Sequence, residues 1–93
     1  MRFDTPSLSN NESNLDELQI YSDFNNDQIV INGLLKLDTE VSIFDMQGRQ
    51  ILRTILSRGN SFNTLNTENF SPGVYLVKVS DSISSISKKV IVR

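Results

Sequence analysis

The sequence is divided into short runs of β-branched and aromatic residues, with turn residues between one run and the next. The runs cover residues 18–21, 28–32, 41–45, 50–57, 62–65, 74–79 and 86–93. Apolar and polar residues alternate in several of them, and this period of two is typical of half-buried strands. No stretch shows a helical period. The pattern predicts an all-β fold, a small antiparallel β-sandwich of about seven strands that is Ig-like or jelly-roll-like.

Turn residues indicate where the predicted strands end. Residues 25–27 form an Asn- and Asp-rich turn after the first run, and Gly48 lies in a short hairpin loop. We expect Gly48 to supply a positive φ there, since glycine carries no side chain to clash. Asp45 precedes the loop, and we expect its carboxylate to accept hydrogen bonds from turn amides.

The last run, residues 86–93, predicts a strand with two different faces. One face carries Ile86, Lys88, Val90 and Val92, and the other carries Ser87, Lys89, Ile91 and Arg93. A strand at a chain end frays unless its ladder holds it, so this hydrophobicity predicts that the strand belongs to the fold. Lysines on an edge strand also discourage aggregation between sheets.

The first residues differ from the rest of the chain. Residues 1–16 are polar, rich in Ser and Asn, and show no alternation. We interpret them as a linker or disordered N-terminal segment and expect one folded domain over residues 17–93. No apolar run approaches the roughly 20 residues that cross a bilayer, and no signal-peptide pattern is present. We interpret Met1 as an expression start, which would make the chain a fragment of a longer protein. If this chain is exported, we expect its signal peptide to lie elsewhere in that protein.

The composition excludes several kinds of chemistry. The chain has no His, Cys or Trp, so it lacks the side chain that titrates nearest neutral pH and the thiolate nucleophile. No serine lies in a Gly-x-Ser-x-Gly elbow, and so small a sandwich has little room for a catalytic cleft. The net charge of −2 disfavours nucleic acid as a partner. We expect no enzyme activity and no cofactor.

Residues 23–27 place oxygen ligands at alternate positions, as a calcium loop does. An EF-hand loop needs glycine where Gln28 stands and an acidic residue where Leu34 stands. We therefore expect an Asx-rich turn in this segment and no metal site.

Three motifs, in order along the chain, resemble those of one family. Residues 41–51 resemble a hairpin of pattern V-x-I-Y/F-D-x-x-G-R/K-x-V/I, and residues 71–79 resemble a strand of pattern x-x-G-V/I-Y-x-V/L-x-V/I. Residues 87–93 resemble a terminal strand in which two lysines precede hydrophobic residues. The family is the C-terminal sorting domain of the type IX (Por) secretion system of Bacteroidetes. The resemblance is to a type A-like member with a variant first turn, since residues 21–26 lack the prolines of the family's Tyr-Pro-Asn-Pro.

The resemblance implies a role in protein transport. Such a domain directs its N-terminal cargo through the outer membrane, and a sortase-like peptidase then commonly removes it at a site before the sandwich, here within residues 1–16. The implied partners are the outer-membrane translocon, shuttle proteins and that peptidase. The implied location is the periplasm in transit, and then the outer membrane, the cell surface or the medium.

By the same resemblance, the recognised surface would include the motif turns and the last strand. The residues concerned are Gly48, Arg49, Gly73, Tyr75, Lys88 and Lys89. Each also has a structural interpretation, because Gly48 and Gly73 suit turns and Tyr75 suits a core position with its hydroxyl reaching solvent. Lys88 and Lys89 suit a protected sheet edge.

Two other functions share the predicted fold. One is a carbohydrate-binding or adhesion sandwich, and the other is a spacer without a ligand. A glycan-binding face usually exposes aromatic rings, whereas we expect most aromatics of this domain to occupy core positions (Tyr21, Phe24, Phe44, Phe62, Phe70 and Tyr75). Exposed sheet edges leave an edge-strand dimer open as a further partner.

Overall fold

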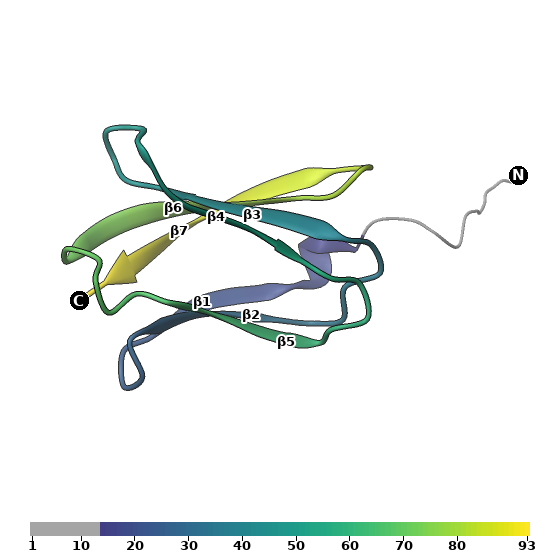
Figure 1. The fold of residues 1–93 in the computed structure, drawn as a ribbon, viewed down its shortest axis with the longest axis horizontal. Helices are drawn as coiled ribbons and strands as arrows, with labels where there is room; N and C mark the ends of the chain where they lie inside the picture. The colour runs from purple at the N-terminus through teal and green to yellow at the C-terminus, as the bar shows by residue number, and fades with distance from the viewer. Residues whose placement is uncertain (1–13) are drawn as a thin grey trace, which may run out of the picture.

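The computed structural model describes residues 14–93, which form two facing antiparallel sheets (Figure 1). One helical turn precedes the first strand. The elements are η1 (Leu15–Glu17), β1 (Gln19–Asp23), β2 (Gln28–Asn32), β3 (Thr39–Phe44), β4 (Gln50–Leu56), β5 (Phe62–Asn66), β6 (Gly73–Ser80) and β7 (Ser85–Val92). Within this part of the chain no helix is long and apolar enough to cross a membrane.

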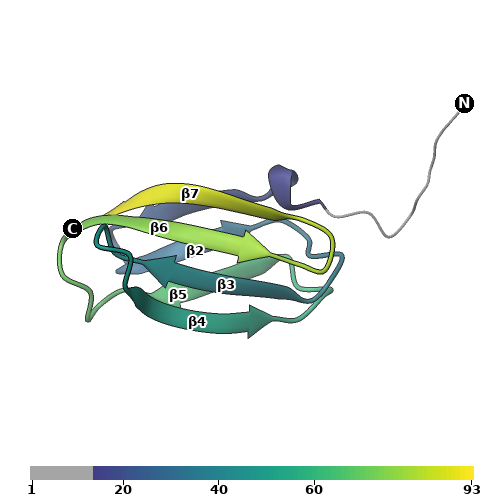
Figure 2. The same cartoon turned by 90° about the horizontal axis from the view of Figure 1, so that it is seen from above.

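The strand order is β1-β2-β5 in one sheet and β4-β3-β6-β7 in the other. Figure 2 shows the four-stranded sheet lying over the three-stranded one. The predicted all-β antiparallel sandwich of seven strands is therefore confirmed. A constant-type immunoglobulin sandwich places its fourth strand in the sheet of the first two, whereas here β4 pairs with β3 in the opposite sheet.

The core lies between the inner faces of the two sheets and consists mainly of β-branched aliphatic side chains. The three-stranded sheet contributes Ile20, Ile29, Ile31 and Leu65. The four-stranded sheet contributes Val41, Ile43, Tyr75, Val77, Val79, Val90 and Val92. Branched side chains fit the pleated surface and lose little rotamer freedom there, so the alternation read from the sequence becomes one continuous apolar layer.

The aromatic residues depart from expectation, because most of them lie outside the core. Tyr75 is buried, but Tyr21, Phe24 and Phe62 are 45%, 44% and 59% exposed. The strand period explains this, since Tyr21 alternates with buried Ile20 and Phe62 alternates with half-buried Asn63. Phe44 and Phe70 are half-buried.

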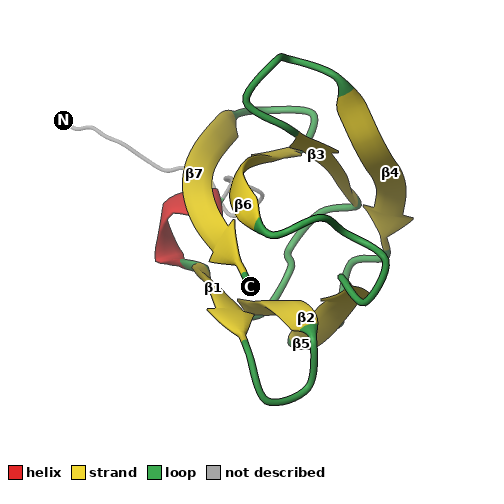
Figure 3. Ribbon diagram, turned by 90° about the vertical axis from the view of Figure 1, so that its left-hand side faces the viewer, coloured by secondary structure: helices red, strands yellow, loops and turns green. Residues whose placement is uncertain are grey.

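The side of the sandwich where β1 approaches β7 is closed by specific contacts. The Ser22 hydroxyl donates to the Ile91 carbonyl oxygen. The guanidinium carbon of Arg93 lies 4.2 Å from the centre of the Phe24 ring, a cation–π contact that holds the end of β7 over the β1–β2 turn. Figure 3 shows β7 beside β1 and η1 at this side. Val90 and Val92 are buried while Lys89 and Ile91 are exposed, so the two faces predicted for the last strand are confirmed.

Residues 14–17 pack onto the sandwich. Leu15 is 1% exposed and belongs to the core, and the Asn14 amide donates to the Leu34 carbonyl oxygen at 2.6 Å. The folded body therefore includes Asn14, although residues 14–16 fall within the predicted linker. The rest of that prediction, residues 1–13, lies outside the described residues.

Candidate functional site

The β3–β4 hairpin turn forms one wall of the candidate site, and Asp45 organises it. One carboxylate oxygen accepts from the backbone amides of Gln47 and Arg49, each at 2.9 Å. The other accepts from Nε of Arg49 at 2.7 Å. Gly48 adopts φ +88° in this turn, which confirms the predicted role of that glycine. The predicted acceptor role of Asp45 is likewise confirmed.

These contacts lower the pKa of Asp45 below its ordinary value. The largest cause is the hydrogen bond from the Arg49 amide, and partial desolvation opposes it. The Arg49 side chain and the Gln47 amide add to the lowering. The carboxylate is thus held ionised by the turn that it organises, and its charge is matched locally by Arg49.

The segment that leads into β6 forms the second wall. The Tyr75 hydroxyl donates to the Ser71 carbonyl oxygen at 2.6 Å, and the Phe70 and Tyr75 ring centres are 5.2 Å apart at an interplanar angle of 47°. Tyr75 therefore fills the core as expected, but its hydroxyl is hydrogen-bonded to the backbone. The bond and the ring contact fix the path of the chain through Ser71, Pro72 and Gly73.

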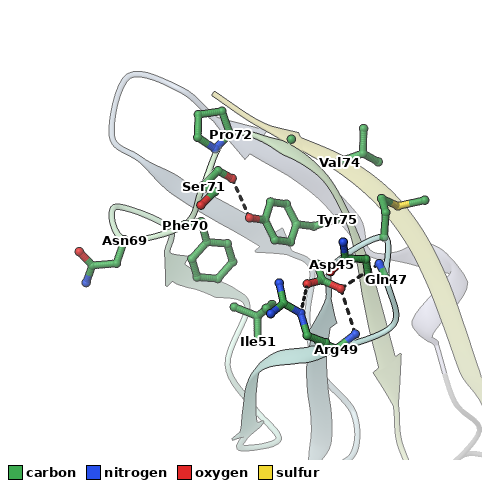
Figure 4. Close-up of a pocket in the computed structure, with 12 residues that line it drawn as sticks. Asp45, Gln47, Arg49, Ile51, Asn69, Phe70, Ser71, Pro72, Val74 and Tyr75 are labelled. Carbon is green, nitrogen blue, oxygen red and sulfur yellow. Dashed lines mark hydrogen bonds and ion pairs between the residues drawn. The ribbon is translucent and has the colours of Figure 1, made fainter.

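The two walls enclose a cleft of about 400 Å³ at one end of the sandwich (Figure 4). We call it the motif cleft, because the two motifs at residues 41–51 and 71–79 supply most of its lining. The hairpin contributes Asp45, Met46, Gln47, Arg49 and Ile51, and the second wall contributes residues 69–75. The Arg49 side chain is 73% exposed and is the cationic group of the cleft. The cleft can therefore offer the exposed N–H donors of a guanidinium, which is paired with Asp45 through Nε, beside apolar and aromatic surface.

The structure brings together some of the six predicted recognition residues and separates others. Arg49, Gly73 and Tyr75 line the motif cleft. Gly48 and Lys89 line a second hollow, on the other side of the hairpin loop. Lys88 lies on the opposite face of β7 from Lys89. Both lysines also line a hollow that contains Tyr21 and Phe24 of the β1 side.

Sequence reasoning did not place Phe70 and Ser71 in the site. Phe70 is recognisable in the sequence only as an aromatic residue of the body, and Ser71 contributes a backbone carbonyl, which has no sequence signal. Within residues 14–93, no group of three or more His, Cys, Asp or Glu side chains is placed to hold a metal ion. In the Asx-rich segment, the Asp23 carboxylate accepts from the Asn25 amide and the Asn26 side chain, as expected of a turn.

The fold and the cleft together define a class of protein. The chain is a small antiparallel β-sandwich whose cleft is lined mainly by two of its three sequence motifs and contains no His or Cys. A family model described as the secretion system C-terminal sorting domain matches residues 8–93. The chain therefore belongs to the C-terminal sorting domains of the type IX secretion system, as its motifs predicted. No curated protein matches the chain.

Membership of this family carries several coarse conclusions. The domain is a type IX sorting signal, and its family is not a family of enzymes. A sorting domain is attached to an N-terminal cargo and interacts with the type IX machinery. Its cargo is exported across the outer membrane to the cell surface or the medium.

Proposed function

We propose that the type IX machinery reads this domain through the motif cleft, and that the domain acts without catalysis of its own. The observation that carries the proposal is the meeting of two separate motifs. The turn at residues 45–49 and the segment at residues 70–75 are far apart in sequence, yet they line one cleft of about 400 Å³. Gly48 and Lys89, on the other side of the hairpin loop, extend the proposed surface.

Arg49 is the best single probe of this proposal. Its exposed guanidinium can bind a partner carboxylate in a forked geometry, while the backbone of the turn is held independently by Asp45. Replacing Arg49 by Gln therefore removes the charge and the fork but keeps the Gln47 and Arg49 amide bonds. Arg53→Gln is the matched control, because Arg53 is also exposed and ion-paired, with Glu40, but lies on the outer face of β4.

The test uses residues 1–93 fused behind a periplasmic signal peptide and a fluorescent reporter, in a host with the type IX machinery and in a strain without it. We expect surface or secreted reporter only where the machinery is present, and at least a severalfold loss with Arg49→Gln. Arg53→Gln should export as the parent does. Equal export of both variants would refute the role of the cleft, and retention of the parent in both strains would refute the sorting role.

Point variants are better probes than truncation of the last strand. Removing residues 88–93 also removes Val90 and Val92, which are 5% and 6% exposed members of the core. Lost export after such a truncation would report lost folding as well as lost recognition.

We also infer that the domain is removed after transit through the periplasm, by a sortase-like peptidase that cuts before Asn14. A peptidase needs an extended substrate, whereas Leu15 is buried and Asn14 is bonded to Leu34. Mass spectrometry of the released reporter should find its new C-terminus within residues 1–13 or in the cargo before them. A terminus at residue 14 or later would contradict this inference.

The exposed aromatics support a second candidate, the glycan-binding module. Strand register puts Tyr21 and Phe62 on the outer face of the three-stranded sheet, with Val30 directly opposite Tyr21. Exposed rings on a sheet face can stack on sugars. A glycan array with the purified domain, beside the double variant Tyr21→Ser and Phe62→Ser, tests this. Glycan binding by the parent that the double variant loses would support the glycan-binding function. An array without any bound glycan would refute that function.

A further inference from the structure

The second hollow near the hairpin lies on the outer face of the four-stranded sheet and combines apolar side chains with lysines. It has a volume of about 430 Å³. We call it the apolar–basic groove and define it by the residues that line it, which are Phe44, Asp45, Met46, Gly48, Leu76, Lys78 and Lys89. Asp45, Met46 and Gly48 come from the β3–β4 loop, and the other four come from β3, β6 and β7.

Strand register orders the groove into rows. Phe44, Leu76 and Lys89 lie directly opposite one another across three adjacent strands. Val74 and Ile91 form the next row, and they are 38% and 56% exposed. Met46 is 61% exposed above these rows. The groove thus lies at one end of an exposed apolar strip, on a sheet face that is not packed against the other sheet, and the next row on its other side is polar, with Ser42, Lys78 and Ser87.

The charge beside this strip is positive, although the protein as a whole carries a net charge of −2. Lys89 forms no ion pair with a carboxylate of residues 14–93. The acidic side chains nearby are already engaged, because Asp45 bonds to Arg49, and Glu40 bonds to Arg53 at 2.7 Å. Lys78 lies close enough to Glu40 to contribute to the lowering of its pKa. The groove therefore complements a ligand that is apolar and acidic.

The spacing of the lysines fits an extended peptide. Lys78 and Lys89 are diagonal neighbours on adjacent antiparallel strands, and such positions are about 7–8 Å apart. Alternate side chains of an extended chain are separated by roughly 7 Å. A segment with carboxylates at alternate positions can therefore reach both lysines while a large apolar side chain enters the hollow beside Met46.

We propose that the apolar–basic groove binds an extended segment of a partner protein that presents one large apolar side chain and two carboxylates on the same face. Gly48 and Lys89 also belong to the proposed recognition surface. At these two residues the proposal rests on the proposed function and deepens it by naming the chemistry of the partner. The binding itself requires neither the export machinery nor the motif cleft, so it can be measured on the purified chain.

The probe is a fluorescent peptide containing Phe-Thr-Glu-Thr-Glu, titrated with the full chain in a polarisation assay at low salt. The control peptide has Gln in place of both Glu. We expect the acidic peptide to bind at least fivefold more tightly than the control peptide, and the difference to shrink as salt is added. Equal affinity for the two peptides, or no binding up to millimolar protein, would overturn the proposal.

Variants of the groove then locate the binding. Lys89→Gln should weaken binding about two- to fivefold, as expected for an exposed ion pair, and Met46→Glu should weaken it further by repelling the carboxylates. Lys88→Gln is the matched control, because it removes the same charge from the adjacent position of β7, which lies on the other face of the strand and does not line the groove. An equal loss of peptide affinity in Lys88→Gln would show that the attraction is non-specific and would overturn the proposal that the groove is the binding site.

The reporter assay separates this inference from the sorting role. If the reporter is exported but the purified chain binds no peptide, the binding proposal is refuted and the sorting function still stands. If the groove variants weaken peptide binding but the reporter stays in the cell, the binding proposal is supported and the sorting function is refuted. Melting temperatures of all variants, measured by circular dichroism, confirm that each compared chain is folded.

Discussion

At the scale of single residues, Asp45 links the shape of the hairpin turn to its charge. Its two oxygens accept three hydrogen bonds from Gln47 and Arg49, and its pKa is lowered by them. The pKa values of Asp23 and Glu40 are also lowered, first of all by hydrogen bonds from Asn26 and Arg53. The three carboxylates therefore affect the pH dependence of stability in the same direction.

We expect the melting temperature to depend on pH through these carboxylates. A carboxylate whose pKa is lower in the folded state stabilises the fold above its ordinary pKa, about 4, and this stabilisation is lost as pH falls through the folded value. The melting temperature should therefore vary little from pH 7 to about pH 5 and fall at lower pH. Asp45→Asn should lower the melting temperature at pH 7. It should also make the fall of the melting temperature at acidic pH shallower. Glu68→Gln is the surface control, and a parallel acid loss in Asp45→Asn and the parent would contradict this.

Gly48 allows a prediction based on conformation alone. Its φ is +88°, and an added Cβ would meet no heavy atom within 4 Å. Gly48→Ala should therefore lower the free energy of unfolding by about 1–2 kcal/mol through backbone strain and not through a clash. Gly48→Asn should cost less, because Asn tolerates positive φ better. Urea denaturation measures both, with Gln47→Ala as the neighbouring control, and equal costs for Ala and Asn would contradict the explanation.

At the scale of elements, β3 is the central strand on which the four-stranded sheet depends. It pairs with β4 on one side and β6 on the other, and Ile43 lies opposite both Leu52 and Val77. Its neighbour β4 is an edge strand whose outer face is open. The same residue type, isoleucine, is 0% exposed at Ile43 and 60% exposed at Ile55 of β4.

This contrast predicts two different costs for one substitution. Ile43→Ala should lower the free energy of unfolding by about 2–5 kcal/mol, because it leaves a cavity between packed strands. Ile55→Ala should change it by no more than about 0.5 kcal/mol. Denaturation with urea compares the two variants directly. A similar cost at both positions would show that the inner and outer faces of the sheet are misassigned.

At the scale of the whole molecule, the sheet edges differ in their protection. The edge of β7 carries Lys88 and Lys89 and contacts β1 through Ser22 and Ile91. The edge of β4 spans Gln50–Leu56. Two of its isoleucines are exposed, Ile51 and Ile55. Long apolar edges are the ones that pair with other chains.

We therefore expect the purified domain to self-associate through β4 at high concentration. Sedimentation of the parent should show a monomer–dimer equilibrium, and Ile55→Lys should shift it to the monomer because a charge would be placed on the pairing edge. Ile83→Lys is the control, since Ile83 is 56% exposed but lies in the β6–β7 turn. If Ile55→Lys still forms dimers, the contact between the chains does not involve the β4 edge. If the parent is monomeric at every concentration, self-association is excluded.

The strands and turns of this protein could be predicted from its sequence, because they depend on interactions between neighbouring residues. The period of two and the turn residues located all seven strands to within a few residues, and the positive φ of Gly48 and the acceptor role of Asp45 were predicted correctly. The family also followed from motif order. These features depend on neighbours in the chain, because alternation, Asx turns and glycine turns are properties of short segments.

The tertiary structure decided the features that join distant segments. It placed β4 beside β3, brought Phe70 and Tyr75 against the Asp45 turn, buried Leu15, and left Tyr21 and Phe62 on an outer face. The period of two shows that a strand has two faces, but pairing and packing between distant strands determine which face is buried. The two hollows depend on the same long-range pairing, since each is lined by residues from several strands and loops.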